Sequence, residues 1–335
     1  MTIPTTPTQA VDRPDLSVSL GPLRLEHPLI NASGTMEIFD LADALGRGIL
    51  EHPPVAAYVP KTVLLSARAG NRPPRILETP AGMINSIGLP GEGLETFVNE
   101  RLPRLLQLPC PLILSIGGFS LQEYASLAAG LRSALERWDI DWSARVGLEA
   151  NISCPNVHSG CASIGSDPGE TVAVVKAIRE VWPWLLIAKL TPNVTDIGVI
   201  ARAAVDGGAD AIAAVNTFKG LVIDRETLRP YLGNVMGGVS GPAIRPLALR
   251  MVHEVFQAVK VPIVGMGGVA SVQDVLDFVA CGARVVAVGS ATFRDPWVAR
   301  DLAHGLAGEL AARGLTLDEL VGLAHHGEAS VCTEA

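Results

Sequence analysis

Aromatic residues make up only 4% of this 335-residue chain and charged residues only 18%. The core must therefore be built from aliphatic side chains. Lys and Arg total 26 against 34 Asp and Glu, a net charge of −8, so the composition gives no general electrostatic basis for binding nucleic acid or an anionic membrane. The longest uncharged apolar stretch, 105–120, contains Gln107, Pro109 and Pro111, and we expect no transmembrane helix. These absences favour a small-molecule function.

Cysteine is also sparse. The five cysteines are Cys110, Cys154, Cys161, Cys281 and Cys332. They form no CxxC pair and have no paired histidine spacing, so we expect reduced thiols, with neither a disulfide framework nor a metal site. The N-terminus lacks a basic start followed by an apolar run, which argues against a secretory signal. We therefore expect a cytoplasmic protein that does not associate with membranes.

What is abundant is a repeated pattern of short aliphatic runs and amphipathic segments, in a chain that is 48% hydrophobic and has 34 glycines and 24 prolines. The runs are 28–31, 55–59, 112–116, 147–152, 185–190, 211–215, 262–265 and 285–288. The predicted helices are 94–106, 121–137, 170–181, 197–206, 246–259 and 272–280. Eight such units favour a closed (β/α)8 TIM barrel over an open α/β sheet. We expect short insertions at the C-terminal face of the strands.

No low-complexity linker divides the chain. We therefore predict a flexible N-terminal tail (1–14), a single barrel domain (15–325) and a C-terminal tail (326–335). In a barrel of this kind the chemistry lies at the carboxyl ends of the strands. Small or polar residues follow every predicted strand, at 32–35, 61–62, 117–120, 153–156, 191–193, 216–217, 267–268 and 289–290. Turns select such residues anyway, but together they supply donors, charge and a thiol at one face.

Two glycine turns follow the last two predicted strands, GMGGV at 265–269 and VGSA at 288–291. Barrels often bind a phosphate at this position, where backbone N–H groups approach the anion. A single GxGG sequence is equally well explained by turn geometry. The chain has no GxxxxGK[ST] motif, so a cofactor phosphate is favoured over a transferred one, and flavin mononucleotide (FMN) is the natural candidate.

The segment NISCPN, 151–156, places Cys154 just past a predicted strand among polar residues. A cysteine is more often a buried hydrophobic residue, but at this polar mouth it could act as a base or nucleophile. Cys161 competes for the same role within a glycine- and serine-rich loop, 157–167, that could move as a lid. We assign no chemistry to His158 in the same loop.

Two lysines lie at or near predicted strand ends. Lys189 lies inside an apolar strand, where a buried ammonium requires an anion or an electron-rich partner. Lys61 ends a short strand, and for it a solvated position is as plausible as a site role. Both would suit a reduced flavin, which gains negative charge.

Nine motifs, read together, resemble class 1, type B dihydroorotate dehydrogenases over about residues 20–323. The motifs are NASGT (31–35), KT (61–62), TPAGMINSIGLP (79–90), NISCPN (151–156), KLTPN (189–193), NT (216–217), GGVSGPA (237–243), GMGGV (265–269) and VGSA (288–291). The chain departs from that family at Ser115, where an Asn is usual, and at Gly91, where many relatives carry a polar residue.

The resemblance implies oxidation of (S)-dihydroorotate to orotate in pyrimidine (UMP) biosynthesis. Cys154 would remove the C5 proton while a hydride passes from C6 to FMN N5. The implied substrate contacts are Lys61, Asn85, Ile87, Gly88, Leu89, Asn151, Asn156, Asn216 and Thr217. The implied FMN contacts are Ala32, Ser33, Lys61, Thr62, Asn151, Lys189, Val215, Gly241, Gly267, Gly268, Gly289 and Ser290. Asparagine suits a ring of alternating carbonyl and N–H groups because its amide both donates and accepts.

Type B enzymes also imply a partner subunit that carries FAD and a [2Fe–2S] cluster and passes electrons to NAD+, in a heterotetramer built on a homodimer of this chain. The chain lacks the cysteine spacing for such a cluster. Three alternatives stay open: an enzyme like dihydropyrimidine dehydrogenase, a dihydroorotate dehydrogenase that uses fumarate or another acceptor without a partner, and a non-catalytic FMN-binding or tRNA-modifying barrel.

Overall fold

The structure, a computed structural model, describes residues 14–153 and 164–326. Cys154, Asn156, His158 and Cys161 lie outside the described residues, as does most of the predicted 157–167 loop. The predicted tails also fall almost wholly outside them, so the tail and domain boundaries stay predictions.

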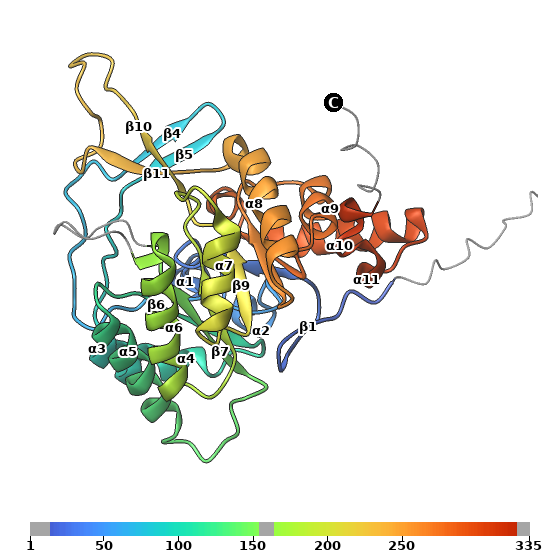
Figure 1. The fold of residues 1–335 in the computed structure, drawn as a ribbon, viewed down its shortest axis with the longest axis horizontal. Coiled ribbons are helices and arrows are strands. Elements are labelled where there is room, and N and C mark those ends of the chain that lie inside the picture. Colours follow the sequence, from blue (N-terminus) through green and yellow to red (C-terminus); the bar gives the residue numbers. More distant parts are fainter. Residues whose placement is uncertain (1–13, 154–163, 327–335) are drawn as a thin grey trace, which may run out of the picture.

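A curved parallel sheet surrounded by helices forms the centre of the molecule (Figure 1). Its strands, in spatial order, are β3 (Leu29–Asn31), β13 (Val285–Val288), β12 (Ile263–Met266), β9 (Ala211–Ala214), β8 (Leu186–Lys189), β7 (Val146–Asn151) and β6 (Leu112–Ile116). Each coincides with a predicted run to within a residue or two. The predicted (β/α)8 barrel is therefore confirmed.

The eighth position of the barrel is filled by residues 55–63, which pair with both edge strands without forming a regular strand. Ala56 N–H donates to Leu29 of β3 over 2.9 Å, and Tyr58 N–H donates to Pro111, beside β6, over 2.9 Å. The side-chain amide of Asn31 takes the place of a ladder pairing: its Nδ2 donates to Val59 O (2.7 Å) and its Oδ1 accepts from Val59 N (2.9 Å). An amide side chain can do this because it carries the same donor and acceptor groups as a peptide unit.

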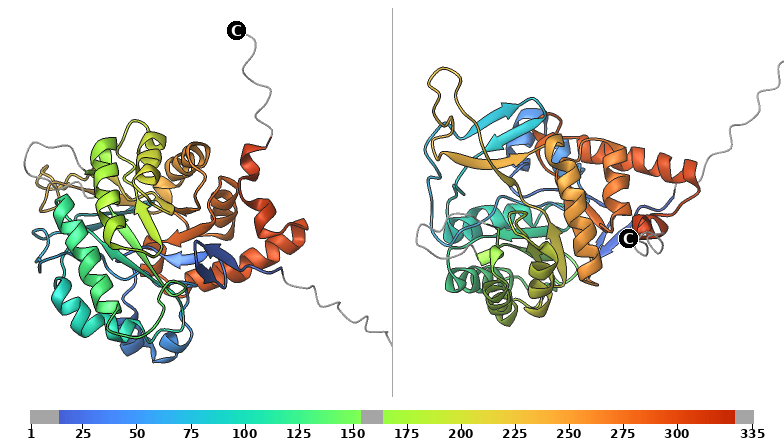
Figure 2. Two further views of the ribbon diagram at one scale, coloured as in Figure 1. Left: turned by 60° about the horizontal axis from the view of Figure 1, so that its bottom comes forward. Right: turned by 45° about the horizontal axis from the view of Figure 1, so that its top comes forward.

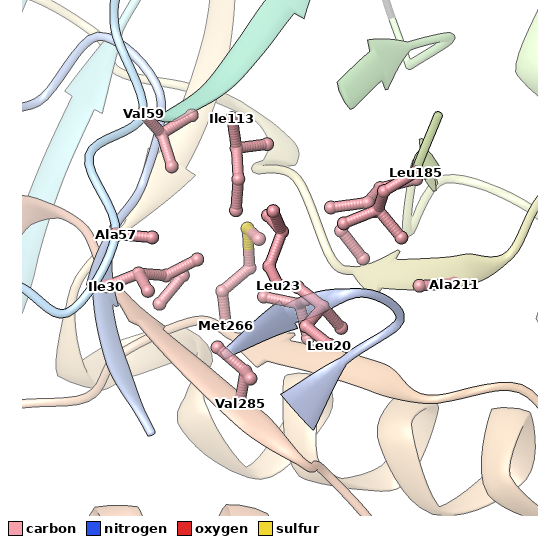
Figure 3. Close-up of a cluster of buried hydrophobic side chains, with 14 of the residues drawn as sticks. Leu20, Leu23, Ile30, Ala57, Val59, Ile113, Leu185, Ala211, Met266 and Val285 are labelled. Carbon is pink, nitrogen blue, oxygen red and sulfur yellow. The ribbon is translucent and has the colours of Figure 1, made fainter. Parts of the chain in front are cut away.

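The barrel interior is aliphatic and is closed at its amino-terminal end by a β-hairpin. The hairpin strands are β1 (Val18–Leu20) and β2 (Leu23–Leu25), paired antiparallel. Leu20 and Leu23 are fully buried and point among Ile113, Leu185 and Met266 inside the barrel (Figure 3). The hairpin thus forms the floor of the barrel.

A second sheet, which was not predicted from the sequence, rises from the opposite end of the barrel (Figure 2, right). Its four antiparallel strands, in spatial order, are β10 (Phe218–Leu221), β11 (Met236–Ser240), β5 (Gly82–Asn85) and β4 (Ile76–Thr79). Two long insertions supply it, one after the 55–63 segment and one after β9. Insertions do lie at the C-terminal face, as predicted, but they are long and together form this sheet.

Helices cover the outside of the sheet (Figure 2, left). Those predicted are observed as α5 (Leu121–Leu135), α6 (Pro168–Val181), α7 (Ile197–Asp206), α8 (Arg245–Ala258) and α9 (Val272–Ala280). Others, not predicted, are α1 (Ile38–Leu45), α2 (Gly48–Glu51), α10 (Val298–Arg313) and α11 (Leu317–Leu320). Short 3-10 turns are η2 (Ile164–Ser166), η3 (Pro242–Ile244), η4 (Ser290–Phe293) and η5 (Leu323–His325). None of the described helices is long and apolar enough to cross a bilayer.

The predicted helix 94–106 is divided into α3 (Leu94–Thr96), a π-helical turn η1 (Phe97–Arg101) and α4 (Leu102–Leu105). Pro103 lies in the first turn of α4. Proline has no N–H to donate to the preceding turn, and such positions favour a change of helical register.

Candidate active site at the carboxyl end of the barrel

A polar layer of the barrel interior lies directly above the aliphatic one. Side chains alternate between the two faces of a strand, so Ser115 faces the same side as Ile113, which points into the barrel (Figure 3). Glu149 is the register partner of Ser115 on the neighbouring strand β7. Lys189, at the end of β8, donates from Nζ to Glu149 Oε1 over 3.2 Å. Glu149 is 4% exposed and Lys189 5%, so this is a buried ion pair.

Hydroxyl groups extend this layer toward the first strand. The Ser115 hydroxyl donates to the same Oε1 of Glu149 over 3.0 Å. Thr62 Oγ1 lies 3.0 Å from Ser115 Oγ and 3.1 Å from Ser33 Oγ. The Ser33 hydroxyl in turn donates to Pro60 O, over 2.9 Å. A continuous hydrogen-bonded chain therefore joins five neighbouring positions of the barrel: β3, the 55–63 segment, β6, β7 and β8.

Asn151, Ser153 and Asn216 form a second hydrogen-bonded cluster. The Asn151 carboxamide oxygen accepts from the Ser153 hydroxyl, and Asn216 Nδ2 donates to Asn151 Oδ1 (3.4 Å) and to Ser153 Oγ. The buried Tyr124 hydroxyl holds the strand end from behind by donating to Asn151 O over 2.7 Å. Ser153 is 4% exposed. Residues 151–153, at the end of β7, are thus held in place by hydrogen bonds.

The second sheet brings Asn85 and Thr217 to the same mouth. Asn85 of β5 is paired in register with Gly238 of β11. A methyl group at Gly238 would lie 2.0 Å from Thr217 Oγ1, so the backbone of β11 passes directly against that side chain. Thr217 directly follows Asn216, whose Oδ1 accepts from Thr217 N over 2.8 Å.

The turn 86–89 that follows β5 also faces the barrel. Leu89 Cδ1 lies 3.9 Å from the position that a Cβ on Gly117 would occupy, just past β6. Asn71 fixes the turn because its N–H donates to Ile87 O over 3.0 Å and its side chain lies against Gly88. Arg68 Nε donates to Gly88 O over 2.9 Å. Ile87, Gly88 and Leu89 are therefore held at the rim beside Asn85.

Close-packed glycines line the other half of the mouth, after β11, β12 and β13. Gly267 and Gly268 have φ values of 131° and 81°, and Gly241 has φ 93°. A methyl group on Gly268 would lie 2.7 Å from Gly241 O, and one on Gly267 would lie 2.6 Å from the Ala248 methyl. Main chain without side chains, near the start of η4 at Ser290, suits an anion because N–H groups in a first helical turn have no intrahelical acceptor.

Ala32, Gly289 and Val215, which were predicted to contact FMN, also lie at this end of the barrel. Ala32 N–H donates to Val288 O over 2.9 Å, which places Ala32 beside Gly289. Val215 is buried at the end of β9, and its N–H donates to Met266 O over 3.2 Å.

Lys61 is half-buried and lies against Gly34, where an added methyl would be 3.0 Å from the lysine Nζ. It borders a cavity of about 550 Å³ beside the barrel mouth. The cavity also adjoins Thr62, Tyr58 and Arg101, and reaches Phe293, which is 59% exposed. Burial raises the pKa of the Tyr58 phenol, and its hydroxyl donates to Met36 O over 2.9 Å.

The structure gathers the described members of the predicted site at one face of the barrel. Three residues of the site were not predicted from the sequence: Glu149, Asn71 and Arg68. Glu149 could have been found, because it is a charged residue within a run expected to be buried. Within the described ranges, no three His, Cys, Asp or Glu side chains lie close enough together to hold a metal ion.

The sequence is also similar to known proteins. A family model described as "Dihydroorotate dehydrogenase" matches residues 15–310. The catalytic subunit of dihydroorotate dehydrogenase B (NAD(+)) from Desulforudis audaxviator is 46% identical over 314 residues, 92% of this chain and 97% of that protein. The catalytic subunits of the same name from Trichlorobacter lovleyi and Carboxydothermus hydrogenoformans are 43% and 42% identical, over 92% and 95% of this chain and 98% and 100% of their own lengths.

Proposed function

Because the chain belongs to the dihydroorotate dehydrogenase family, we propose that it oxidises (S)-dihydroorotate to orotate in pyrimidine biosynthesis, with FMN bound at the carboxyl end of the barrel. The observation that carries this proposal is the convergence of a glycine cradle, a buried lysine and an asparagine cluster on one mouth. The chain is then an oxidoreductase of the catalytic-subunit type.

The described residues fit FMN. Gly241, Gly267 and Gly268 pack so closely that a Cβ on any of them would lie within 2.7 Å of a neighbouring protein atom, so the chain carries no side chain here, and the phosphate would lie against this backbone. Ser33, Thr62, Asn151 and Lys189 would then contact the ring system from the opposite half of the mouth. When bound, FMN would supply the acceptor for the hydride.

Three asparagines at the mouth would bind the substrate. Dihydroorotate is a ring of alternating carbonyl and N–H groups with one carboxylate. Asn85, Asn151 and Asn216 each offer both a donor and an acceptor, and Lys61 would face the carboxylate. Residues 87–89, in the turn fixed by Asn71 and Arg68, would contact one side of the substrate ring.

Cys154 would remove the C5 proton. The hydrogen bonds of the preceding residue, Ser153, with Asn151 and Asn216 support this assignment. Asn156, two residues further along, would join the substrate contacts. Both of these assignments come from the sequence resemblance.

Electrons would leave through a partner. We propose that a second polypeptide with FAD and a [2Fe–2S] cluster passes them to NAD+, in a heterotetramer built on a homodimer of this chain, in the cytoplasm. The printed names of the relatives, which specify NAD(+) and a catalytic subunit, support this proposal. The test is NAD+ reduction with the chain alone and with the partner added; reduction by the chain alone would contradict it.

Anaerobic titration of the purified protein with dihydroorotate tests the reaction. We expect bound FMN absorbance to bleach fully with dihydroorotate and to remain with dihydrouracil. Bleaching by dihydrouracil would instead favour the alternative related to dihydropyrimidine dehydrogenase. A colourless protein that takes up no FMN would contradict the proposal altogether.

Rapid-reaction measurements on two matched variants test the base. We expect Cys154→Ser to slow flavin reduction by dihydroorotate by about 10²-fold or more, the usual contribution of a general base, and Cys161→Ser to change it little. Equal rates for Cys154→Ser and the wild type would refute the assignment.

A further inference from the structure

The ion pair between Glu149 and Lys189 has no role in the proposed substrate contacts, yet it lies in the innermost polar layer of the site. Both side chains are almost completely buried. A single oxygen, Glu149 Oε1, accepts from Lys189 at 3.2 Å and from Ser115 at 3.0 Å. Removing one member of such a pair leaves an uncompensated charge in a region with little water.

The charge of Lys189 is balanced by Glu149, the carboxylate that accepts a hydrogen bond from its ammonium group. The ammonium at the end of β8 is therefore largely compensated from the β7 side. A ligand at the mouth therefore experiences the field of a dipole whose positive end points outward. This field is weaker than the field of an unpaired cation.

We propose that Glu149 is a positioning residue that sets the reduction potential of the bound flavin by compensating the charge of Lys189. The inference rests on the proposed function. A two-electron reduction with uptake of a proton leaves extra electron density on the flavin, and a nearby positive charge stabilises that form. Glu149 thus keeps the flavin potential lower than an unpaired Lys189 would, which favours passing electrons onward to an acceptor of low potential.

The test is the midpoint potential of FMN bound to Glu149→Gln, measured against the wild type by reductive titration with a reference dye at pH 6.0. Glutamine keeps the shape of the side chain and removes its charge. We expect the equilibrium constant for FMN reduction to rise at least tenfold, about +30 mV for a two-electron couple. A merely structural role for Glu149 would lower stability and leave the potential unchanged.

Ser115→Ala is the matched control because it removes the other hydrogen bond to the same oxygen without changing any charge. We expect its reduction equilibrium to stay within threefold of the wild type. If Glu149→Gln does not fold, Glu149→Asp replaces it: the charge is kept but lies one methylene further from Lys189, and we expect a smaller shift in the same direction.

The outcomes separate the two proposals. A wild-type protein that binds no FMN overturns the proposed function and this inference with it. A wild type that is bleached by dihydroorotate, with the potential of the folded Glu149 variant unchanged or lowered, overturns the inference alone. A shift in Ser115→Ala as large as in the Glu149 variant also overturns it.

Discussion

Asn31 and Val59 form two hydrogen bonds that close the barrel, one in each direction between the side-chain amide and the backbone. Asn31 is fully buried and Val59 is 1% exposed. The proposed flavin site includes residues just beyond each of them. They are Ser33 on the first segment and Lys61 and Thr62 on the second. The closure of the fold and the assembly of the site therefore depend on the same side chain.

We predict that Asn31→Leu lowers the free energy of unfolding by about 2–4 kcal/mol, because the N–H and C=O of Val59 would be left buried without partners. Urea denaturation followed by circular dichroism measures this. Asn99→Leu, at an exposed position, is the control and should change stability by less than about 0.5 kcal/mol. If the loss of stability is no larger for Asn31→Leu than for the control, these two hydrogen bonds do not stabilise the barrel closure.

Gly268→Ala tests the glycine cradle. The added methyl would lie 2.7 Å from Gly241 O, at a backbone φ of 81°. We expect at least tenfold weaker FMN binding, about 1.4 kcal/mol, measured by fluorescence titration of the apoprotein.

Gly314→Ala is a matched control for that variant. Gly314 has a similar φ of 63°, lies at the end of α10 and has no atoms within 4 Å of an added methyl. It should cost about 1 kcal/mol of stability and leave FMN affinity unchanged. Equal loss of FMN binding in both variants would show that strain alone, and not the cradle, explains the result.

His27 gives the fold a pH dependence. Burial, and then the nearby His304, lower the pKa of His27 from 6.5 to about 4, and its Nδ1 accepts from Leu29 N over 3.2 Å. Between pH 6.5 and 4 the unfolded chain binds a proton here that the folded chain does not, so stability falls as the pH falls through this range. We expect a loss of about 1 kcal/mol between pH 8 and pH 5.5.

The variant His27→Asn keeps the acceptor and removes the titration, so its free energy of unfolding should fall less over the same range. Chemical denaturation at the two pH values measures both proteins. The same loss in variant and wild type would show that another group is responsible.

Cys110 should be unreactive in the folded protein. Burial raises the pKa of its thiol to about 11, so almost none is thiolate at pH 8. Peptide mapping after maleimide treatment should find Cys110 modified only after denaturation. Modification of Cys110 in the folded protein, at a rate comparable to that after unfolding, would contradict this.

The barrel could be predicted because its strands and helices are encoded locally. The aliphatic runs of β6 and β13 were located to the residue, since a strand covered on both faces contains little else. Helices α7 and α9 were also predicted to the residue, and each begins directly after a capping side chain, Asp196 and Ser271.

The second sheet could not be predicted in the same way. Its strands have mixed burial and contain glycines such as Gly82, Gly237 and Gly238, which have low strand propensity. They are held by pairing between segments about 150 residues apart, as with Asn85 and Gly238. The partner of Glu149 could not be predicted for a related reason: Lys189 is distant in sequence, and only the parallel pairing of β7 and β8 brings the two together.

The β1–β2 hairpin restricts how small molecules reach the reaction centre. With Leu20 and Leu23 filling the base of the barrel, reactant and product share one route through the opposite opening. Orotate must depart before another molecule of dihydroorotate arrives, and the two should therefore compete in steady-state kinetics.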